Sequence, residues 1–435
     1  MLYHNMMKES VSNAGRDTKR FSATDYLKIT ILVFAMTGLW QGMHIIILPL
    51  RVLDFVPEAE KNTYLGLLTF SGLILAMVVQ PIVGAISDRS GFSWGRRRPY
   101  ILLGVILMLL LLPGIGLASS YAVLLTIYCL MHISSNAVQG PHQGFIPDLV
   151  PEGKRGLASG VKGFLEILGG VALIYPIAIF MDNYALGQGS QWLWLSLVLP
   201  GVIILGFMVA TVLMVKERPG IGGPRFSILP TICRTFKINI RANRSFIWFL
   251  LSRLFVFAAL AIIQQFSLYF LQDVVGVADP AGAAARFTIL AVVGMLAVVY
   301  PAGRLSDRIG RKPIGISSAL LGALGVLIII LSKDYTTILI AAGIIGVALG
   351  AFSSTNWAIA TDLVAKGEEA RYLGLANVAT AGAGALARLI GPVIDFFEKQ
   401  SAGLGYQVML IACFVYFVIG ALLLLKVEGR VNLEG

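Results

Sequence analysis

Residues 78–99 read VVQPIVGAISDRSGFSWGRRRP, and the organisation of the whole chain follows from this stretch. An apolar run ends in Asp88-Arg89, and after a short turn three arginines precede the next apolar run. Residues 298–313, VVYPAGRLSDRIGRKP, repeat the theme about 220 residues later. In the same way, the motif that begins at Asp148 returns at Asp362. Two repeats in one order at nearly one spacing indicate a duplicated chain with two halves.

The composition is that of a membrane protein. Of the 435 residues, 57% are hydrophobic and 13% are charged, and the mean hydropathy is +0.82. A soluble chain of this length carries roughly a quarter charged residues. The net charge of +11 raises the question of nucleic-acid binding, which the distribution of the charges has to decide.

Twelve apolar runs are long enough to cross a bilayer, which takes about 20 residues each. They fall near 27–50, 63–86, 100–118, 121–146, 158–181, 191–215, 245–271, 284–304, 314–331, 336–361, 372–396 and 404–426. The sequence therefore predicts an all-α membrane protein whose twelve transmembrane helices form two pseudo-symmetric six-helix bundles.

The basic residues predict which side each loop faces. Arg51, Lys61, Lys333 and Lys399 fall in loops on one side, whereas most of the 34 lysines and arginines fall in the tails and the loops on the other side. Because cytoplasmic loops carry this excess, both termini are expected in the cytoplasm, and no nucleic-acid partner is expected. The predicted divisions are a cytoplasmic tail (1–26), an N-terminal bundle (27–215), a cytoplasmic linker (216–244), a C-terminal bundle (245–426) and a cytoplasmic tail (427–435).

Two spans of the first half carry polar side chains along one helical face. These sets are Thr37, Gln41 and His44 in span one, and His132, Asn136, Gln139 and Gln143 in span four. Polar groups are costly in lipid, so both faces should look into the bundle, where they line a cavity or bond to other helices. The single stripe in span four favours a cavity, with His132 near mid-bilayer. His142 lies off this stripe and is expected to be structural.

Span five holds Lys162 and Glu166 at positions i and i+4, close enough to pair. A mutual ion pair is the cheapest way to keep two charges in a membrane, so a structural bridge is one interpretation. The other makes Glu166 a proton or cation site that Lys162 tunes.

The second half places arginines inside the membrane. The polar residues of its spans are Arg253 and Gln264 in span seven, Asn356 and Trp357 in span ten, and Asn377, Arg388 and Asp395 in span eleven. An intramembrane arginine needs a carboxylate, backbone carbonyls or a substrate anion. Arg253 therefore binds substrate or snorkels to the interface, and Arg388 binds substrate or is neutralised by Asp395. Trp357 suits stacking on a sugar ring and equally suits packing.

The repeated loops have a mechanical use as latches on the cytoplasmic face. Asp88 could meet the N-terminus of a neighbouring helix, and the arginines could reach carboxylates or lipid phosphates. The predicted gating residues are Gly84, Asp88, Arg89, Gly95, Arg96, Arg97, Asp148, Arg155, Gly303, Asp307, Arg308, Gly310, Arg311, Asp362 and Arg371.

These motifs resemble the major facilitator superfamily, in which each six-span half carries Gly-x-x-x-Asp-Arg followed by a Gly-Arg run. The expanded first copy resembles the plant sucrose–proton symporters and related glycoside–cation symporters, and so do residues 136–149. The resemblance implies a proton-coupled sugar transporter. Two positions depart from it: His132 stands where that family has a proton-carrying Asp, and Gln143 stands where it has an Arg. An imidazole can replace the carboxylate because it titrates near neutral pH. Otherwise coupling has moved to Glu166, or the chain is a facilitator without coupling.

The expected function is alternating-access transport of a small hydrophilic solute, a sugar or glycoside, with H⁺ or Na⁺ as coupling ion. Proton coupling is assigned to His132 and Glu166. The expected substrate contacts are Gln41, His44, Asn136, Gln139, Arg253, Gln264, Asn356, Trp357, Asn377 and Arg388. The alternatives are an exporter of amphipathic compounds and a membrane assembly factor that transports nothing. We expect a monomer in the plasma membrane, without a cofactor, a metal or enzymatic activity.

Overall fold

The computed structural model describes residues 22–217, 243–363 and 369–427, and these residues are helical almost throughout. The first half contains α2 (Ala23–Gly42), η1 (Met43–Ile47), α3 (Leu48–Leu53), η2 (Glu58–Glu60), α4 (Lys61–Ser87), α5 (Arg98–Leu117), α6 (Tyr121–Gln143), α7 (Phe145–Leu149), η3 (Glu152–Lys154), α8 (Arg155–Ala185) and α9 (Gln191–Met214). The second half contains α11 (Arg244–Phe270), η4 (Leu271–Val275), α12 (Pro280–Ile309), α13 (Arg311–Leu331), α14 (Tyr335–Leu363), α15 (Glu369–Arg388), α16 (Gly391–Glu398) and α17 (Leu404–Leu425).

Twelve helical segments within the described residues are long and apolar enough to cross a membrane, which confirms the predicted number. The first runs over Ala23–Leu53 and the fifth over Glu152–Ala185, so several are longer than their apolar cores. Polar ends extend them. At the start of α2, for example, the Ser22 side chain caps the backbone and Asp25 bonds back to Ser22.

The turn of each repeated motif depends on a glycine. Gly95 has φ +133° and Gly310 has φ +100°, and each directly precedes an arginine of its motif. L-residues with a Cβ rarely adopt these values, whereas glycine does so without steric cost. The two glycines therefore allow the sharp turn that precedes Arg96 and Arg311 in the two copies of the motif.

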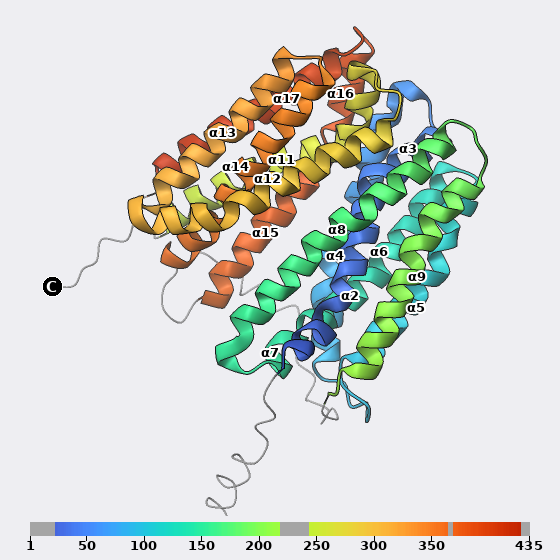
Figure 1. Ribbon diagram of the computed structural model, residues 1–435, viewed down its shortest axis with the longest axis vertical. Coiled ribbons are helices and arrows are strands. Elements are labelled where there is room, and N and C mark those ends of the chain that lie inside the picture. The colour runs from blue at the N-terminus through green and yellow to red at the C-terminus, as the bar shows by residue number, and fades with distance from the viewer. Residues whose placement is uncertain (1–21, 218–242, 364–368, 428–435) are drawn as a thin grey trace, which may run out of the picture.

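The two halves lie side by side and meet through several helices of each half. Figure 1 shows that the blue-to-green half approaches the yellow-to-red half near α3 and α16 and diverges from it towards α7. In the interface α4 packs on α15 and α16, and α12 packs on α8. We call the end that carries Asp88 and Asp307 the motif end, and the end that carries Lys61 and Asp273 the far end.

Candidate functional site

A cavity of about 330 Å³ lies within the first half. Its lining residues come from α2, η1, α4, α6 and α8. They are Leu32, Val33, Met36, Thr37, Trp40, His44, Leu73, Ala76, Gln80, His132, Ser135, Asn136, Val138, Gln139, His142, Gln143, Lys162 and Glu166. Along α6 the lining runs from His132 in the middle of the helix to Gln143 at its last turn, so the cavity lies between mid-membrane and the motif end.

Four aromatic and imidazole rings gather at the deep end of this cavity, and we call them the ring cluster: Trp40, His44, Tyr128 and His132. The ring centroids of Trp40 and His132 are 4.2 Å apart, and the two imidazoles stack at 5.7 Å. The Tyr128 hydroxyl lies 2.8 Å from Nε2 of His132 and 2.9 Å from Nε2 of His44. Trp40 donates its indole N–H to Ser135 Oγ at 2.8 Å, which fixes the plane of the ring.

The Tyr128 hydroxyl links the protonation of the two histidines. A hydroxyl has one proton, so it donates to one imidazole and accepts from the other. When both rings are neutral, His44 and His132 therefore carry their protons on different nitrogens. Nδ1 of His132 is buried and has no hydrogen-bond partner, although its ring lines the cavity. Buried polar atoms are normally paired, so this atom is available to a ligand.

Local sequence explains why the rings fit. A Cβ at Gly72 of α4 would lie 2.5 Å from Cε1 of Tyr128 and 2.6 Å from Cδ2 of His132, so only glycine leaves room for both rings. On the opposite wall the α-helix widens into a π-helical turn, Met43–Ile47, at His44. Such turns are frequent at functional sites because they shift side chains out of the regular helical register.

The other polar residues of spans one and four line the cavity as predicted, with two differences that concern His142 and Gln41. Asn136 is buried and donates its amide to the carbonyl of His132 at 2.8 Å. His142, expected to be structural, lines the cavity too. Gln41 does not belong to the lining and instead lies against Gly170 of α8, with its Cγ 3.7 Å from where a Cβ would stand.

Lys162 and Glu166 form the ion pair that their spacing predicted, with Nζ to Oε1 at 2.8 Å. Both residues also line the cavity, at its motif-end side. The pair therefore brings charge to the wall of the cavity, where Glu166 is both bridged to Lys162 and within the lining.

The second half holds a separate cluster around Arg253. Its Nε donates to Thr380 Oγ1 at 2.8 Å, and its Nη1 donates to Asn356 Oδ1. The guanidinium also lies 5.1 Å from the ring centroid of Phe257 and 4.9 Å from that of Trp357. Arg253 is 3% exposed, so it does not snorkel: neutral acceptors and aromatic faces hold its charge inside the protein.

The predicted lining from the second half is not found around the 330 Å³ cavity. Gln264 lines a separate hollow of about 100 Å³ between α11, α12 and α14. Arg253, Asn356 and Trp357 belong to the cluster just described, and Asn377 lies exposed on α15. In this state of the protein, these residues of the second half therefore do not line the same cavity as the residues of the first half.

Neutralisation of Arg388 by Asp395, one of the two interpretations of this arginine, is not found among the described residues. The helix breaks between them, because α15 ends at Arg388 and α16 begins at Gly391. Arg388 instead donates Nη1 to the carbonyl of Gly384 at 2.5 Å. Asp395 binds a different helix altogether.

At the motif end, the first copy of the repeated motif binds within its own half. Arg97 pairs with Asp88 at 2.6 Å and with Asp148 at 2.5 Å, and Arg96 pairs with the same Asp148 oxygen at 2.5 Å. The hydrogen bond to Asp148 raises the pKa of Arg96 above its ordinary value, despite partial burial. Asp88 is thus held by Arg97, where a neighbouring helix N-terminus was expected. Gly84 faces Gly140 of α6, whose Cα lies 3.7 Å from where a Cβ would stand.

The second copy repeats this arrangement. Arg311 pairs with Asp362 at 2.5 Å and more loosely with Asp307 at 3.9 Å. Gly303 faces Ser354 of α14, as Gly84 faces α6. The other predicted gating residues behave differently. Arg155 donates to the carbonyls of Pro147 and Val150. Arg89 is half-buried and has a partner, whereas Arg308 lies exposed. The side chain of Arg371 is outside the described residues.

Two members of the ring cluster, Trp40 and Tyr128, were missed in the sequence. Both are apolar enough to carry no penalty in lipid, so a search for polar residues passes over them. A signal was present nonetheless: each stands four residues before one of the two histidines, on the same helical face.

A twelve-helix bundle with a small-molecule cavity beside mid-membrane is the architecture of a multi-pass membrane transporter. A family model described as MFS/sugar transport protein matches residues 60–427, most of the chain, and the chain belongs to this family. The predicted superfamily is thereby confirmed. This is a family of transport proteins, in agreement with the expectation that the chain is no enzyme.

Curated relatives match over parts of the chain. Solute carrier family 45 member 4 of Mus musculus is 33% identical over 122 residues, 25% of this chain and 16% of that protein. A sucrose transport protein of Oryza sativa subsp. japonica is 34% identical over 143 residues, 28% of this chain and 25% of that protein. Lactose permease of Leuconostoc lactis is 24% identical over 263 residues, 56% of this chain and 41% of that protein. The matches thus span less than half the length of these relatives.

The fold is shared with solved transporters. A bacterial homologue of the human lysosomal transporter Spinster, solved in an inward-facing and unoccupied conformation, has a TM-score of 0.71 at 18% identity, covering 94% of this chain and 97% of the other. At this identity the likeness concerns the fold alone.

Proposed function

We propose that this chain is a secondary transporter that carries a sugar or glycoside across the plasma membrane by alternating access, coupled to protons. The observation that carries the proposal is the cavity in the first half. Its volume of about 330 Å³ falls in the range of small-molecule sites. Hydrogen-bonding groups such as Asn136 and Gln139 line it beside the flat faces of Trp40 and His132, a combination that suits a ring bearing hydroxyl groups.

The relatives support the substrate class, since their names include sucrose transport protein and lactose permease. The charge distribution predicts that the motif end faces the cytoplasm. The cavity lies on that side of mid-membrane, and the halves diverge there (Figure 1). This arrangement supports alternating access, with the present state open towards the cytoplasm. Arg253 and Arg388 would enter the site from the second half when the halves rock together.

His132 is the proposed proton carrier. When His132 donates Nε2–H to Tyr128, its Nδ1 is an acceptor without a partner, on a ring that lines the cavity. Protonation turns Nδ1 into a donor, and a substrate hydroxyl can bond to it in either role. Proton binding would therefore change the hydrogen bond offered to the substrate, which is what coupling requires. Glu166 is the second candidate, because it lines the same cavity and forms an ion pair with Lys162 there.

The proposal is tested by uptake into proteoliposomes, with a panel of mono- and disaccharides and an imposed pH gradient. We expect at least one sugar or glycoside to accumulate when the gradient is present. His132→Gln keeps a hydrogen-bonding group but cannot titrate, so it should abolish gradient-driven accumulation while downhill exchange continues. Thr126→Ala is the matched control: Thr126 lies on the exposed face of the same helix and bonds only to its own backbone.

Three results would count against parts of this proposal. If no sugar or glycoside crosses under either condition, the substrate class is wrong. If His132→Gln keeps accumulation and Glu166→Gln loses it, coupling belongs to Glu166. If both variants accumulate substrate like the parent chain, neither residue couples the proton.

A further inference from the structure

The two halves are joined at the far end by a pair of contacts that mirror each other. Asp395, in α16 of the second half, accepts the backbone N–H groups of Asn62 at 3.3 Å and Thr63 at 2.6 Å, in the first turn of α4. Asp182, in α8 of the first half, accepts the backbone N–H groups of Ala281 at 2.9 Å and Gly282 at 2.7 Å, in the first turn of α12. Each half therefore caps a helix of the other.

The register of the two caps is the same. Asp395 binds the second and third residues of α4, and Asp182 binds the second and third residues of α12. Asn62 and Ala281 are separated by the same number of positions as Asp88 and Asp307 of the repeated motif. The caps are thus a product of the duplication, and they make the interface self-complementary, as in a two-fold dimer.

Neither helix caps itself. Glu60 and Asp279 stand at the N-cap positions of α4 and α12, and neither side chain accepts a hydrogen bond from the backbone N–H groups of its own helix. Asp279 pairs with Arg286 instead, at 2.6 Å. The free N–H groups and the positive end of the helix dipole are therefore satisfied by the carboxylate of the opposite half. When the halves separate at this end, both helices lose their cap.

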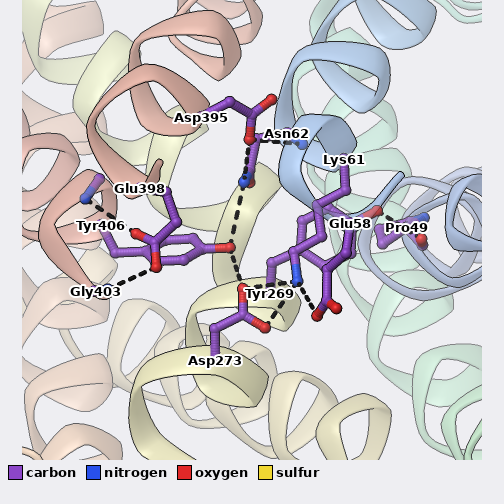
Figure 2. Close-up of polar contacts among 11 residues, drawn as sticks. Pro49, Glu58, Lys61, Asn62, Tyr269, Asp273, Asp395, Glu398, Gly403 and Tyr406 are labelled. Atoms are coloured by element: carbon purple, nitrogen blue, oxygen red, sulfur yellow. Dashed lines mark hydrogen bonds and ion pairs between the residues drawn. The ribbon is translucent and has the colours of Figure 1, made fainter. Parts of the chain in front are cut away.

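The two caps differ in their surroundings. Figure 2 shows Asp395, Asn62, Lys61, Asp273 and Tyr406 directed towards one another between the ribbons of the two halves. Asn62 Nδ2 bonds to Asp395 at 2.9 Å, the Tyr406 hydroxyl bonds to Asp273 at 2.6 Å, and Lys61 pairs with Asp273 at 2.7 Å. Asp395, Asn62 and Lys61 are all buried, whereas Asp182 is half-buried.

We propose that Asp182 and Asp395 are the paired latches of the far end: they hold the two halves together there, and both must release before the cavity can open to that side. The cap of Asp395 is the stronger latch because it is buried and carries the network of Lys61 and Asp273. The proposal concerns the conformational equilibrium and holds whichever solute the cavity carries.

The test measures distances between spin labels across the far end by pulsed electron resonance, in a chain whose native cysteines are replaced by alanine. One label stands at Leu186→Cys in the first half and one at Lys333→Cys in the second, both exposed. Loss of a helix cap changes an equilibrium by roughly 2- to 30-fold. We therefore expect Asp182→Ala and Asp395→Ala each to enlarge the long-distance population, Asp395→Ala more so, and the double variant to make it dominant.

Asp334→Ala is the matched control, because Asp334 caps α14 at the same end but within one half. A second label pair inside the first half, Leu117→Cys with Leu186→Cys, reports whether the variant is folded. If the double variant keeps the parental distances across the halves while the second pair is unchanged, the latch proposal is overturned. Should the alanine variants fail to fold, Asp182→Asn and Asp395→Asn carry the same comparison, since they remove the charge and keep the size.

Discussion

The two ends of this bundle use charged side chains in opposite ways. At the far end Lys61 of one half binds Asp273 of the other, and two carboxylates cap helices across the interface. At the motif end Arg97 binds Asp88 and Asp148, and Arg311 binds Asp362, each within its own half. The far end is thus fastened between the halves, while the motifs make each half a rigid body that can move as a unit.

The largest effect expected from this comparison follows removal of Lys61. Its side chain is 3% exposed, so Lys61→Met leaves Asp273 without its buried partner and should cost about 3 kcal/mol of stability. The midpoint of thermal unfolding, followed by intrinsic fluorescence in detergent, measures the loss.

Arg311→Met is the motif-end counterpart of that substitution. Arg311 and Asp362 are both solvent-accessible, so their pair is worth about 1 kcal/mol or less. Equal losses in the two variants would remove the distinction between a buried fastening across the halves and an exposed contact within one.

A smaller effect distinguishes the two copies of the motif. Gly95→Ala and Gly310→Ala each place a Cβ at a positive φ, which costs about 1 kcal/mol. At Gly95 the new Cβ would also lie 2.4 Å from Oε2 of Glu217, whereas at Gly310 its nearest neighbour is Pro313 at 3.5 Å. Gly95→Ala should therefore lower the unfolding midpoint further. Gly91→Ala, with nothing within 4 Å, should leave it unchanged, and a reversed order would refute this account of the turn.

The smallest effect concerns Asp334, whose cap stays within one half. Hydrogen bonds from the backbone N–H and then the side chain of Thr337 hold the pKa of Asp334 below its ordinary value. The unfolded chain then binds the proton more readily, so this cap contributes stability above pH of about 4 and loses it as pH falls through the lowered pKa. Unfolding midpoints of the parent and Asp334→Ala should converge on acidification, and a constant difference down to pH 2 would contradict the assignment.

The membrane spans and the polar stripe were predictable because both are local properties of the chain. Twenty apolar residues cross a bilayer wherever they occur, and a period of 3.6 residues places His132 and Asn136 on one face whatever lies opposite. The ion pair of Lys162 and Glu166 follows from the same helical spacing and was found where expected.

What escaped prediction depends on how distant segments meet. The partner of Asp395 is a helix start more than 300 residues away, and no local pattern specifies it. The interpretation that Asp395 neutralises Arg388 assumed one continuous helix. The helix breaks at Leu389 and Ile390, so the two residues no longer share a helical face. Arg253 and Asn356 were expected to contact substrate, but Arg253 bonds to Asn356 and Thr380 of its own half instead, and these contacts between distant helices have no local pattern.

The two repeats share the same helical scaffold, but the walls of the polar 330 Å³ cavity come from the first repeat. Under the proposed function we therefore expect the first repeat to contribute most of the solute preference. A chimera that joins this first half to the second half of a relative should keep the preference of the first.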